Sequence, residues 1–298
     1  MTIAREEVAA PIQVGVAPRI LERLGTLPLH VGIIVLTVAW IVPTVGLLVS
    51  SFRPLSAFST SGWWTALSPP FAFTLDNYQH ILATSNLSRS FFNSFMISIP
   101  ATVIPTTIAA FAAYAFSWMR FWGRDWIFLA LVGLLAVPLQ VTFIPVLSLF
   151  IKLGVSATFL AVWLAHTGYG LPFAIYLLAN FFRALPADLF ESAEIDGAGT
   201  LTVFFRIILP LSVPALASLV IFQFLWVWND LLVALVYLGG TPEVAPLTVT
   251  LANLVGSLGQ GLQFLTAAAF ISMIVPLIVF FSLQRYFVRG ILAGSVKG

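Results

Sequence analysis

The sequence predicts an all-α, polytopic membrane protein with six transmembrane helices. Charged residues make up 8% of the 298 residues and hydrophobic residues 60%, whereas roughly 25% of an ordinary globular protein is charged. So few charges cannot cover the surface of a water-soluble domain. Six intervals lack Asp, Glu, Lys and Arg, and each exceeds the roughly 20 residues that a helix needs to cross a bilayer: Leu24–Phe52, Ser90–Met119, Trp126–Ile151, Leu153–Phe182, Ile207–Asn229 and Val244–Gln284.

These intervals reflect the solvent around them, because a charge at mid-bilayer costs about 2.5 to 3.5 kcal/mol and a helix satisfies its own backbone there. The last interval is too long for one span, and its first part, which includes Asn253 and Gln260, is polar and rich in glycine. We therefore begin the sixth helix near residue 264. The predicted transmembrane domain covers residues 29–288, with spans at about 29–51, 90–117, 126–151, 158–182, 212–236 and 264–286.

The distribution of basic residues predicts the orientation of the chain. If the N-terminus is inside, the inner segments hold Arg5, Arg19, Arg23, Arg120, Arg124, Arg183, Arg206, Arg285, Arg289 and Lys297. The outer segments then hold only Arg53, Arg89 and Lys152. We therefore expect both termini, a leader of residues 1–28 and a tail of residues 289–298, in the cytoplasm. The first apolar run begins too far into the chain and is too long for a cleaved signal peptide, so it should remain as an anchor.

The positions of tryptophan and proline also fit a polytopic membrane protein. The outer connection between the first two spans carries Trp63 and Trp64, a pair typical of the membrane interface. Prolines occur in most of the later spans: Pro100, Pro105, Pro138, Pro145, Pro172, Pro210, Pro214 and Pro276. Bilayers tolerate them where neighbouring helices or water satisfy the freed carbonyl groups, so they favour a packed bundle over separate anchors.

The most informative segment is the inner loop between the fourth and fifth spans, residues 183–211. Pro186 suits the first turn of a helix and Asp188 complements the positive end of its dipole, so we predict a short helix from there to about Asp196. The glycine-rich run at 197–199 permits a turn after this helix. Thr200 is then expected to cap a second helix that enters the fifth span.

The short helix has an apolar stripe and acidic residues on its other faces. The stripe is predicted at Leu185, Leu189 and Ala193, and the acids are Asp188, Glu191 and Glu194. Acids are unusual at an inner membrane face, where basic residues normally gather. Two interpretations remain open at this point: a surface helix with a solvated acidic face, or a rigid knob that offers an acid to an arginine of a cytoplasmic partner.

This loop resembles the cytoplasmic EAA loop in the membrane subunits of binding-protein-dependent ABC importers. That pattern is E-A-A, three residues, G, nine residues, then I-x-L-P. The corresponding residues are Glu191, Ser192, Ala193, Gly197, Ile207, Leu209 and Pro210, and only Ser192 departs from it. Further segments resemble the sugar-importer branch that includes the maltose-type permeases: FTLDNY at 73–78, NS at 93–94, AAYAF at 112–116, WND at 228–230 and the tail at 284–298, which is similar to the maltose G-type subunit.

The resemblance implies a type I importer fold of six helices. The chain would pair with a second, related permease above two copies of a P-loop ATPase subunit, in a prokaryotic cytoplasmic (inner) membrane. An extracytoplasmic sugar-binding protein would deliver the substrate. In that family the loop helix docks in a groove of the ATPase: Glu191 would contact it, Gly197 would allow the turn, Pro210 would join the loop to the fifth span, and Glu194 and Asp196 belong to the same coupling loop.

The resemblance also implies a substrate class. A sugar is expected, such as a disaccharide or an oligosaccharide of the α-glucoside type, while glycerol phosphate or a polyol remains open. In related importers one permease can hold most of the substrate contacts, and a G-like subunit can be the poorer contributor.

The residues themselves bear on the energy source. A phosphate-binding P-loop needs G-x-x-x-x-G-K-[ST], and the only lysines are Lys152, which follows Ile151, and Lys297, which follows Val296. The chain by itself therefore cannot be a P-loop ATPase. We expect no catalytic residue and no cofactor in it, with ATP and Mg on the partner ATPase subunits.

Polar groups inside the fifth span are candidates for a substrate pathway. Gln223, Trp226 and Asp230 are spaced i, i+3 and i+7, and Asn229 lies beside them. Amides and carboxylates can hydrogen bond to sugar hydroxyls, and tryptophan can stack on the apolar C–H face of a sugar. The alternative is that Asn229 and Asp230 cap a helix, pair between helices or lie at the outer water boundary.

His166 in the fourth span is expected to be a hydrogen-bonded packing residue. No histidine, cysteine or carboxylate stands near it at metal-ligand spacing, so no metal site is predicted. Four further polar residues of the spans stay unassigned: Gln140, Tyr169, Tyr176 and Asn180.

Two other classes of membrane protein compete with the importer. An ion-coupled secondary transporter usually has ionisable residues at mid-membrane, and only Asp230 comes near that description. A membrane-embedded enzyme needs convergent polar groups, but the histidines at 30, 80 and 166 are dispersed. A net charge of +2 gives no basic footprint for nucleic acid.

Overall fold

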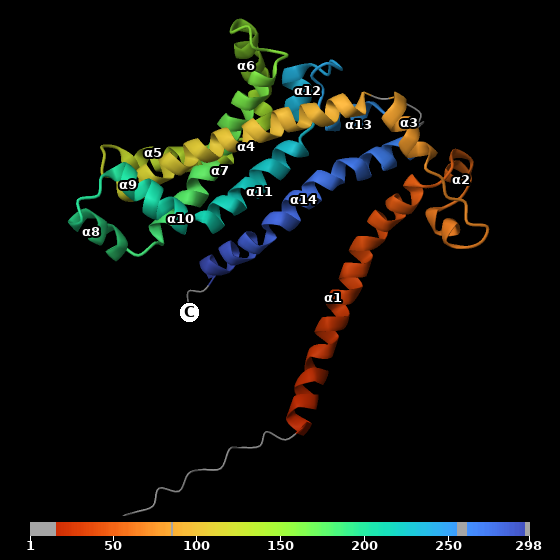
Figure 1. Cartoon of the computed structure of the whole chain (residues 1–298), viewed down its shortest axis with the longest axis horizontal. Coiled ribbons are helices and arrows are strands. Elements are labelled where there is room, and N and C mark those ends of the chain that lie inside the picture. The colour runs from red at the N-terminus through yellow and green to blue at the C-terminus, as the bar shows by residue number, and fades with distance from the viewer. Residues whose placement is uncertain (1–15, 85, 255–260, 296–298) are drawn as a thin grey trace, which may run out of the picture. The chain divides into compact units, whose positions relative to one another are not determined.

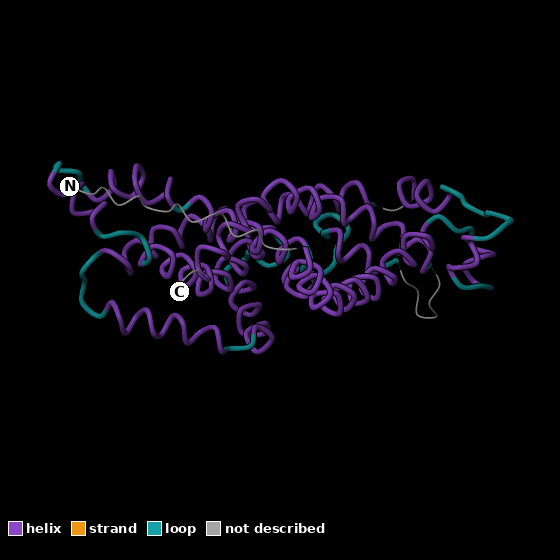
Figure 2. Tube along the Cα trace, turned by 90° about the horizontal axis from the view of Figure 1, so that it is seen from below, coloured by secondary structure: helices purple, strands orange, loops and turns teal. Residues whose placement is uncertain are grey.

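The computed structural model describes residues 16–84, 86–254 and 261–295, and all regular secondary structure in these ranges is helical (Figures 1 and 2). This confirms the predicted all-α class. The chain divides into two compact units, residues 1–73 and 74–298. The first contains α1 (Val16–Ser51), α2 (Leu55–Thr60) and the short helix η1 (Trp63–Leu67).

The second unit contains the remaining helices. In chain order these are α3 (Asp76–Thr84), α4 (Leu87–Trp118), α5 (Arg124–Gly133), η2 (Leu134–Ala136), α6 (Leu139–Lys152), α7 (Phe159–Arg183), α8 (Asp188–Ile195), α9 (Thr200–Val203), η3 (Phe204–Ile208), α10 (Leu209–Leu211), α11 (Val213–Trp228), α12 (Leu232–Leu238), α13 (Leu247–Asn253) and α14 (Leu262–Ser295).

In the first unit, polar contacts organise the segment that follows α1. The buried Arg53 donates hydrogen bonds to the carbonyl oxygens of Ala57 at 2.7 Å and Ser61 at 2.9 Å, which holds α2 in place. Trp63 packs on α1 at Gly46, where a Cβ atom would lie 2.7 Å from the indole nitrogen. Trp64 is 64% exposed. The two tryptophans therefore have different surroundings, since Trp63 packs on α1 and Trp64 is exposed.

Four of the described helices are long and apolar enough to cross a membrane, or up to six spans are present if each of two bent pairs counts as one. The single helices are α1 from Leu27 onward, α4, α7 and α14 up to Gln284. The bent pairs are 124–136 with 139–152, at 99°, and 200–211 with 213–228, at 75°. The expected span at 126–151 therefore contains the first bend, and the expected span at 212–236 contains α11 and α12, which are separated by residues 229–231.

Proline explains both bends. Pro138 has no N–H to donate and holds Val137 in an extended conformation, so η2 stops there and α6 starts in a new direction. The second bend falls at Ser212, between Pro210 and Pro214. By contrast, Pro172 lies inside the unbroken α7.

The centre of the second unit is the long contact between α4 and α7. Small residues line it, among them the fully buried Ala101 and Ala113 of α4 and Ala161 and Ala179 of α7. Such residues let membrane helices approach closely. α11 packs against α4 and α14, and Figure 1 shows these three helices running side by side.

Side chains at the N-terminal end of α4 fasten the connection between α12 and α13. The Asn93 amide donates to the carbonyl oxygens of Glu243 and Ala245, at 3.0 and 3.1 Å. Ser94 Oγ accepts from the N–H of Leu247 at 2.8 Å, at the start of α13. These bonds satisfy backbone groups that the bilayer would leave without water.

We expect Asn93→Leu to destabilise this end of the bundle. It leaves the buried carbonyl group of Ala245 and the partly buried one of Glu243 without this donor, at a cost of about 1 to 3 kcal/mol. The thermal unfolding midpoint of the purified protein should fall by several degrees. Asn253→Leu, at an exposed amide, is the control and should change it little; equal midpoints for both variants would contradict the role of Asn93.

Candidate functional site

The loop between α7 and α11 forms a helix, a turn and a second helix. α8 covers Asp188–Ile195, which confirms the predicted short helix, and Gly197 follows with a φ of +73°. Residues with a Cβ atom rarely adopt this conformation, so the turn requires glycine here. The predicted cap is wrong: Thr200 is the first residue of α9, and Gly199 occupies the cap position.

One face of α8 is clamped to the end of α4 and α7. The ring of Phe190 stacks on Trp118 of α4, with centroids 3.5 Å apart, and the indole nitrogen of Trp118 donates to the carbonyl oxygen of Phe182 at 3.1 Å. Phe190 and Ala193 are buried, whereas Leu189 is 40% exposed. The predicted apolar stripe is therefore wrong at Leu189, and Phe190 takes its place.

The second half of the loop is also tied to the bundle. Tyr114 of α4 donates its hydroxyl hydrogen to the carbonyl oxygen of Thr200 at 3.2 Å. Ile207 and Leu209 pack against the apolar cluster of α4 and α7. Pro210 is exposed, in the turn of helix just before the bend at Ser212. The loop thus continues into α11 through ordered helical turns.

The acidic residues of α8 face away from the clamp. Glu191, Glu194 and Asp196 are exposed, as is Asp188 at the start of the helix. None of them forms an ion pair within the described part of the chain. Ser192, also exposed, donates only to the carbonyl oxygen of Asp188 at 2.8 Å. α8 is therefore a fixed helix with an open acidic face.

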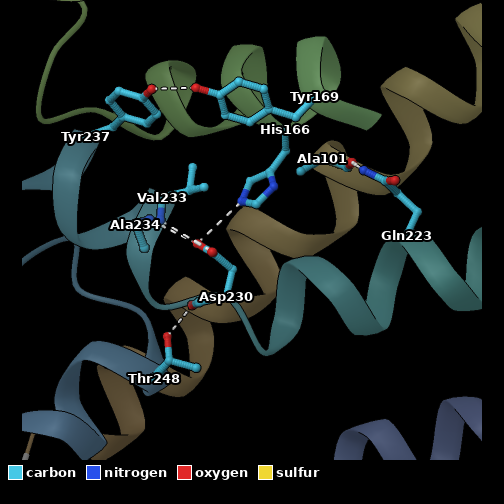
Figure 3. Close-up of polar contacts among 9 residues, drawn as sticks. All are labelled: Ala101, His166, Tyr169, Gln223, Asp230, Val233, Ala234, Tyr237 and Thr248. Atoms are coloured by element: carbon cyan, nitrogen blue, oxygen red, sulfur yellow. Dashed lines mark hydrogen bonds and ion pairs between the residues drawn. The ribbon is translucent and has the colours of Figure 1, made fainter. Parts of the chain in front are cut away.

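On α11, Gln223 and Trp226 line a cavity of about 270 Å³ between α7 and α11. Gln223 is buried, and its Nε2 donates to the carbonyl oxygen of Ala101 on α4 at 3.1 Å (Figure 3). The sequence missed the α7 side of this cavity, formed by Tyr169, Gly170 and Phe173. The spacing of Tyr169, Phe173 and Tyr176 at i, i+4 and i+7 is the pattern that could have indicated it.

The side chains of Asn229 and Asp230 form hydrogen bonds with nearby backbone groups. α11 ends at Trp228, so the expected common face of Gln223, Trp226 and Asp230 does not continue to Asp230. The Asn229 amide donates to the carbonyl oxygen of Leu225 at 2.7 Å. The Asp230 carboxylate accepts from the N–H groups of Val233 and Ala234 at 3.3 and 3.0 Å (Figure 3). The capping alternative therefore describes both residues.

His166 is fully buried and points from α7 toward Asp230 (Figure 3). Its Nε2 lies 3.7 Å from Asp230 Oδ2, and its ring meets the ring of Trp226 edge to face at 5.0 Å. Neither ring nitrogen has a hydrogen-bond partner among the described residues, so the expected hydrogen bond is absent from this part of the chain. No group of three potential metal ligands occurs in the described ranges.

Comparisons with known proteins agree with this arrangement. Residues 85–293 match the model of the family described as "Binding-protein-dependent transport system inner membrane component". The chain is 59% identical to the osmoprotective compounds uptake permease protein of Synechocystis sp. over 274 residues, which are 91% of this chain and 92% of that protein.

Two further proteins are similar. The alpha-glucoside transport system permease protein of Rhizobium meliloti is 57% identical over 241 residues, 79% of this chain and 63% of that protein's length. A solved structure of a bacterial ABC transporter involved in the import of the acidic polysaccharide alginate has the same fold, with a TM-score of 0.73 at 21% identity, covering 93% of this chain and all of that one.

The turn after α8 yields a prediction. Gly197→Pro forces φ to a negative value and removes the N–H that donates to Glu194 at 3.0 Å, so local stability should fall by about 3 kcal/mol. Hydrogen exchange of the α8 amides should become faster. Gly199→Pro is the matched control because φ there is −71°, which proline accepts. Unchanged exchange in Gly197→Pro would contradict the assigned turn.

Proposed function

The chain belongs to the family of binding-protein-dependent transport system inner membrane components and is the permease subunit of an ABC importer; from this premise we propose that it imports a small, uncharged α-glucoside. The relatives support this substrate class, since one carries alpha-glucosides in its name and another osmoprotective compounds. A small glucoside could satisfy both descriptions. A larger oligosaccharide, glycerol phosphate and a polyol are the alternatives.

The other components of the transporter belong to the same proposal. The chain would pair with a second permease and sit on two copies of a P-loop ATPase subunit that bind ATP and Mg, because it has no P-loop of its own. An extracytoplasmic binding protein would deliver the sugar. The excess of basic residues in alternate connections supports an inner-membrane location with both termini in the cytoplasm.

The single observation that carries the mechanism is the two-sided environment of α8. Its acidic side chains are exposed, while Phe190 is buried and stacked on Trp118. A partner that moves Glu191 would therefore move the ends of α4 and α7 as well. The second half of the loop would carry the same displacement through Ile207 and Leu209 into α11. ATP-driven closure of the ATPase subunits could in this way switch the permease between outward and inward access.

Asp230 argues against an ion-coupled secondary transporter. Its carboxylate accepts two backbone hydrogen bonds at the start of α12 and its carbonyl oxygen accepts one from Thr248 at 2.6 Å (Figure 3). A coupling carboxylate would have to exchange its ion or proton during transport. The Asp230 carboxylate instead caps the first turn of α12 through these hydrogen bonds.

Transport by the whole complex tests the proposed function. We expect proteoliposomes with both permeases and both ATPase subunits to accumulate radiolabelled maltose only with internal ATP and the external binding protein. Accumulation that needs no ATPase subunit and stops when an ionophore collapses the ion gradients would establish the secondary transporter instead. ATP-dependent uptake of glycerol phosphate or a polyol in place of maltose would correct the substrate class alone.

The coupling role of α8 predicts the effect of a charge reversal. Glu191→Lys places a cation where an arginine of the ATPase is expected, so uptake should fall by about tenfold or more, since a like-charge contact costs several kcal/mol. Membrane insertion should be unchanged. Glu243→Lys, an exposed glutamate at the opposite end of α4, is the matched control and should leave co-purification of the ATPase intact. Full uptake by Glu191→Lys would remove this residue from the coupling contact.

A further inference from the structure

We propose that the cavity between α7 and α11 is a subsite for one pyranose ring of the transported sugar, so that this subunit contacts the substrate directly. The inference rests on the proposed function and deepens it. The cavity of about 270 Å³ is lined by Tyr169, Gly170, Phe173, Phe222, Gln223 and Trp226. Ligand sites start at roughly 300 Å³, so this one suits a single ring rather than a whole oligosaccharide.

The lining matches the surface of a sugar. A pyranose has apolar C–H faces and a rim of hydroxyl groups, so aromatic walls and an amide can meet both. Four of the lining residues are aromatic and none is charged. The Nε2 of Gln223 is already bound to Ala101, while no hydrogen bond to its Oε1 comes from the described residues. That oxygen can therefore accept a hydrogen bond from a hydroxyl.

The walls are held in place before any ligand arrives. The Tyr169 hydroxyl lies 2.6 Å from the Tyr237 hydroxyl of α12 (Figure 3). It also lies 2.9 Å from Thr142 Oγ1, so its ring is anchored from α12 and α6. Trp226 packs on the edge of the buried His166 at 5.0 Å. Because these side chains need little ordering on binding, the entropic cost of association is reduced.

Gly170 leaves room for the amide. A Cβ atom built there would lie 2.8 Å from both Nε2 and Oε1 of Gln223, so even alanine would displace this amide. Gly168, two residues earlier on the same helix, has nothing within 4 Å of its Cβ position. The two glycines therefore differ in whether an added methyl group would contact the Gln223 amide.

The surroundings on α7 are also suited to a polar solute. Tyr169, Phe173, Tyr176 and Asn180 follow one another at i, i+4, i+7 and i+11, so they form one face that runs from the cavity toward the end next to α8. Tyr176 is 41% exposed, and Asn180 is exposed as well. Polar groups inside a membrane-spanning helix face water or protein rather than lipid. This face is therefore a candidate for the path that the sugar follows after the subsite.

The matched glycines give the first test, in the complete reconstituted complex with maltose as the probe. Gly170→Ala should lower maltose uptake by about tenfold, because displacing a polar partner of a bound hydroxyl costs on the order of 1 to 3 kcal/mol. Gly168→Ala should stay within about twofold of the wild type, as a surface substitution does. Co-purification of the ATPase should be unchanged in both variants.

The aromatic wall gives a second variant. Trp226→Leu should reduce uptake, and Trp226→Phe should restore most of it because a flat ring returns. If Gly170→Ala and Trp226→Leu both transport maltose at the wild-type rate, the subsite is overturned while the importer function stands. If the wild-type complex transports no maltose although it hydrolyses ATP, the proposed substrate fails first and the subsite fails with it.

A photoreactive probe distinguishes the sugar from another occupant of the cavity. A maltose derivative with a diazirine, added to the assembled wild-type complex, should label peptides that contain residues 169–173 or 222–226, and Gly170→Ala should lower that labelling. Labelling confined to the second permease, together with cross-linking of a photoreactive residue at position 173 to that permease, would assign the cavity to subunit packing and overturn the proposal.

Discussion

The structure depends on one constraint of the bilayer: every backbone N–H and C=O group inside it must find a partner within the protein. Continuous helices meet this demand in α4, α7 and α14. Where the helical ladder is interrupted, named side chains take over. Asp230 accepts the free N–H groups at the start of α12, and Asn93 donates to the carbonyl oxygens of the segment before α13. At these two interruptions a polar side chain that would otherwise be costly to bury is paired with the backbone.

The same constraint explains why the acidic residues gather outside the spans. In α8, Phe190 and Ala193 supply the buried contact and the acids remain in solvent. The Phe190–Trp118 stack holds an aqueous helix on the end of a membrane bundle. A surface helix with only a solvated acidic face would not need this attachment. The packed contact between Phe190 and Trp118, together with the exposed acidic side chains, favours a docking role for the loop.

Close packing of small residues has a second consequence for the bundle. Alanines let α4 and α7 meet along their whole contact, whereas glycine at 170 leaves space beside α11. The cavity arises where a glycine faces an amide and aromatic rings surround both. Its lining therefore comes from two helices, and one of its polar atoms is held by the third, α4.

The amino-acid sequence by itself determined the helical class, the approximate positions of the apolar segments, the short helix at α8 and its glycine turn. These follow from local rules: charge exclusion from lipid, capping preferences and the permissive backbone of glycine. The sequence could not determine where prolines bend a helix and where they do not, since Pro138 breaks a span and Pro172 does not. It also misassigned Leu189 and Thr200, and it left Asp230 open between a substrate pathway and a capping role. Tertiary structure decided the contacts that Phe190, Asp230 and Gly170 make across helices, because their partners Trp118, His166 and Gln223 lie on other helices and no local pattern contains them.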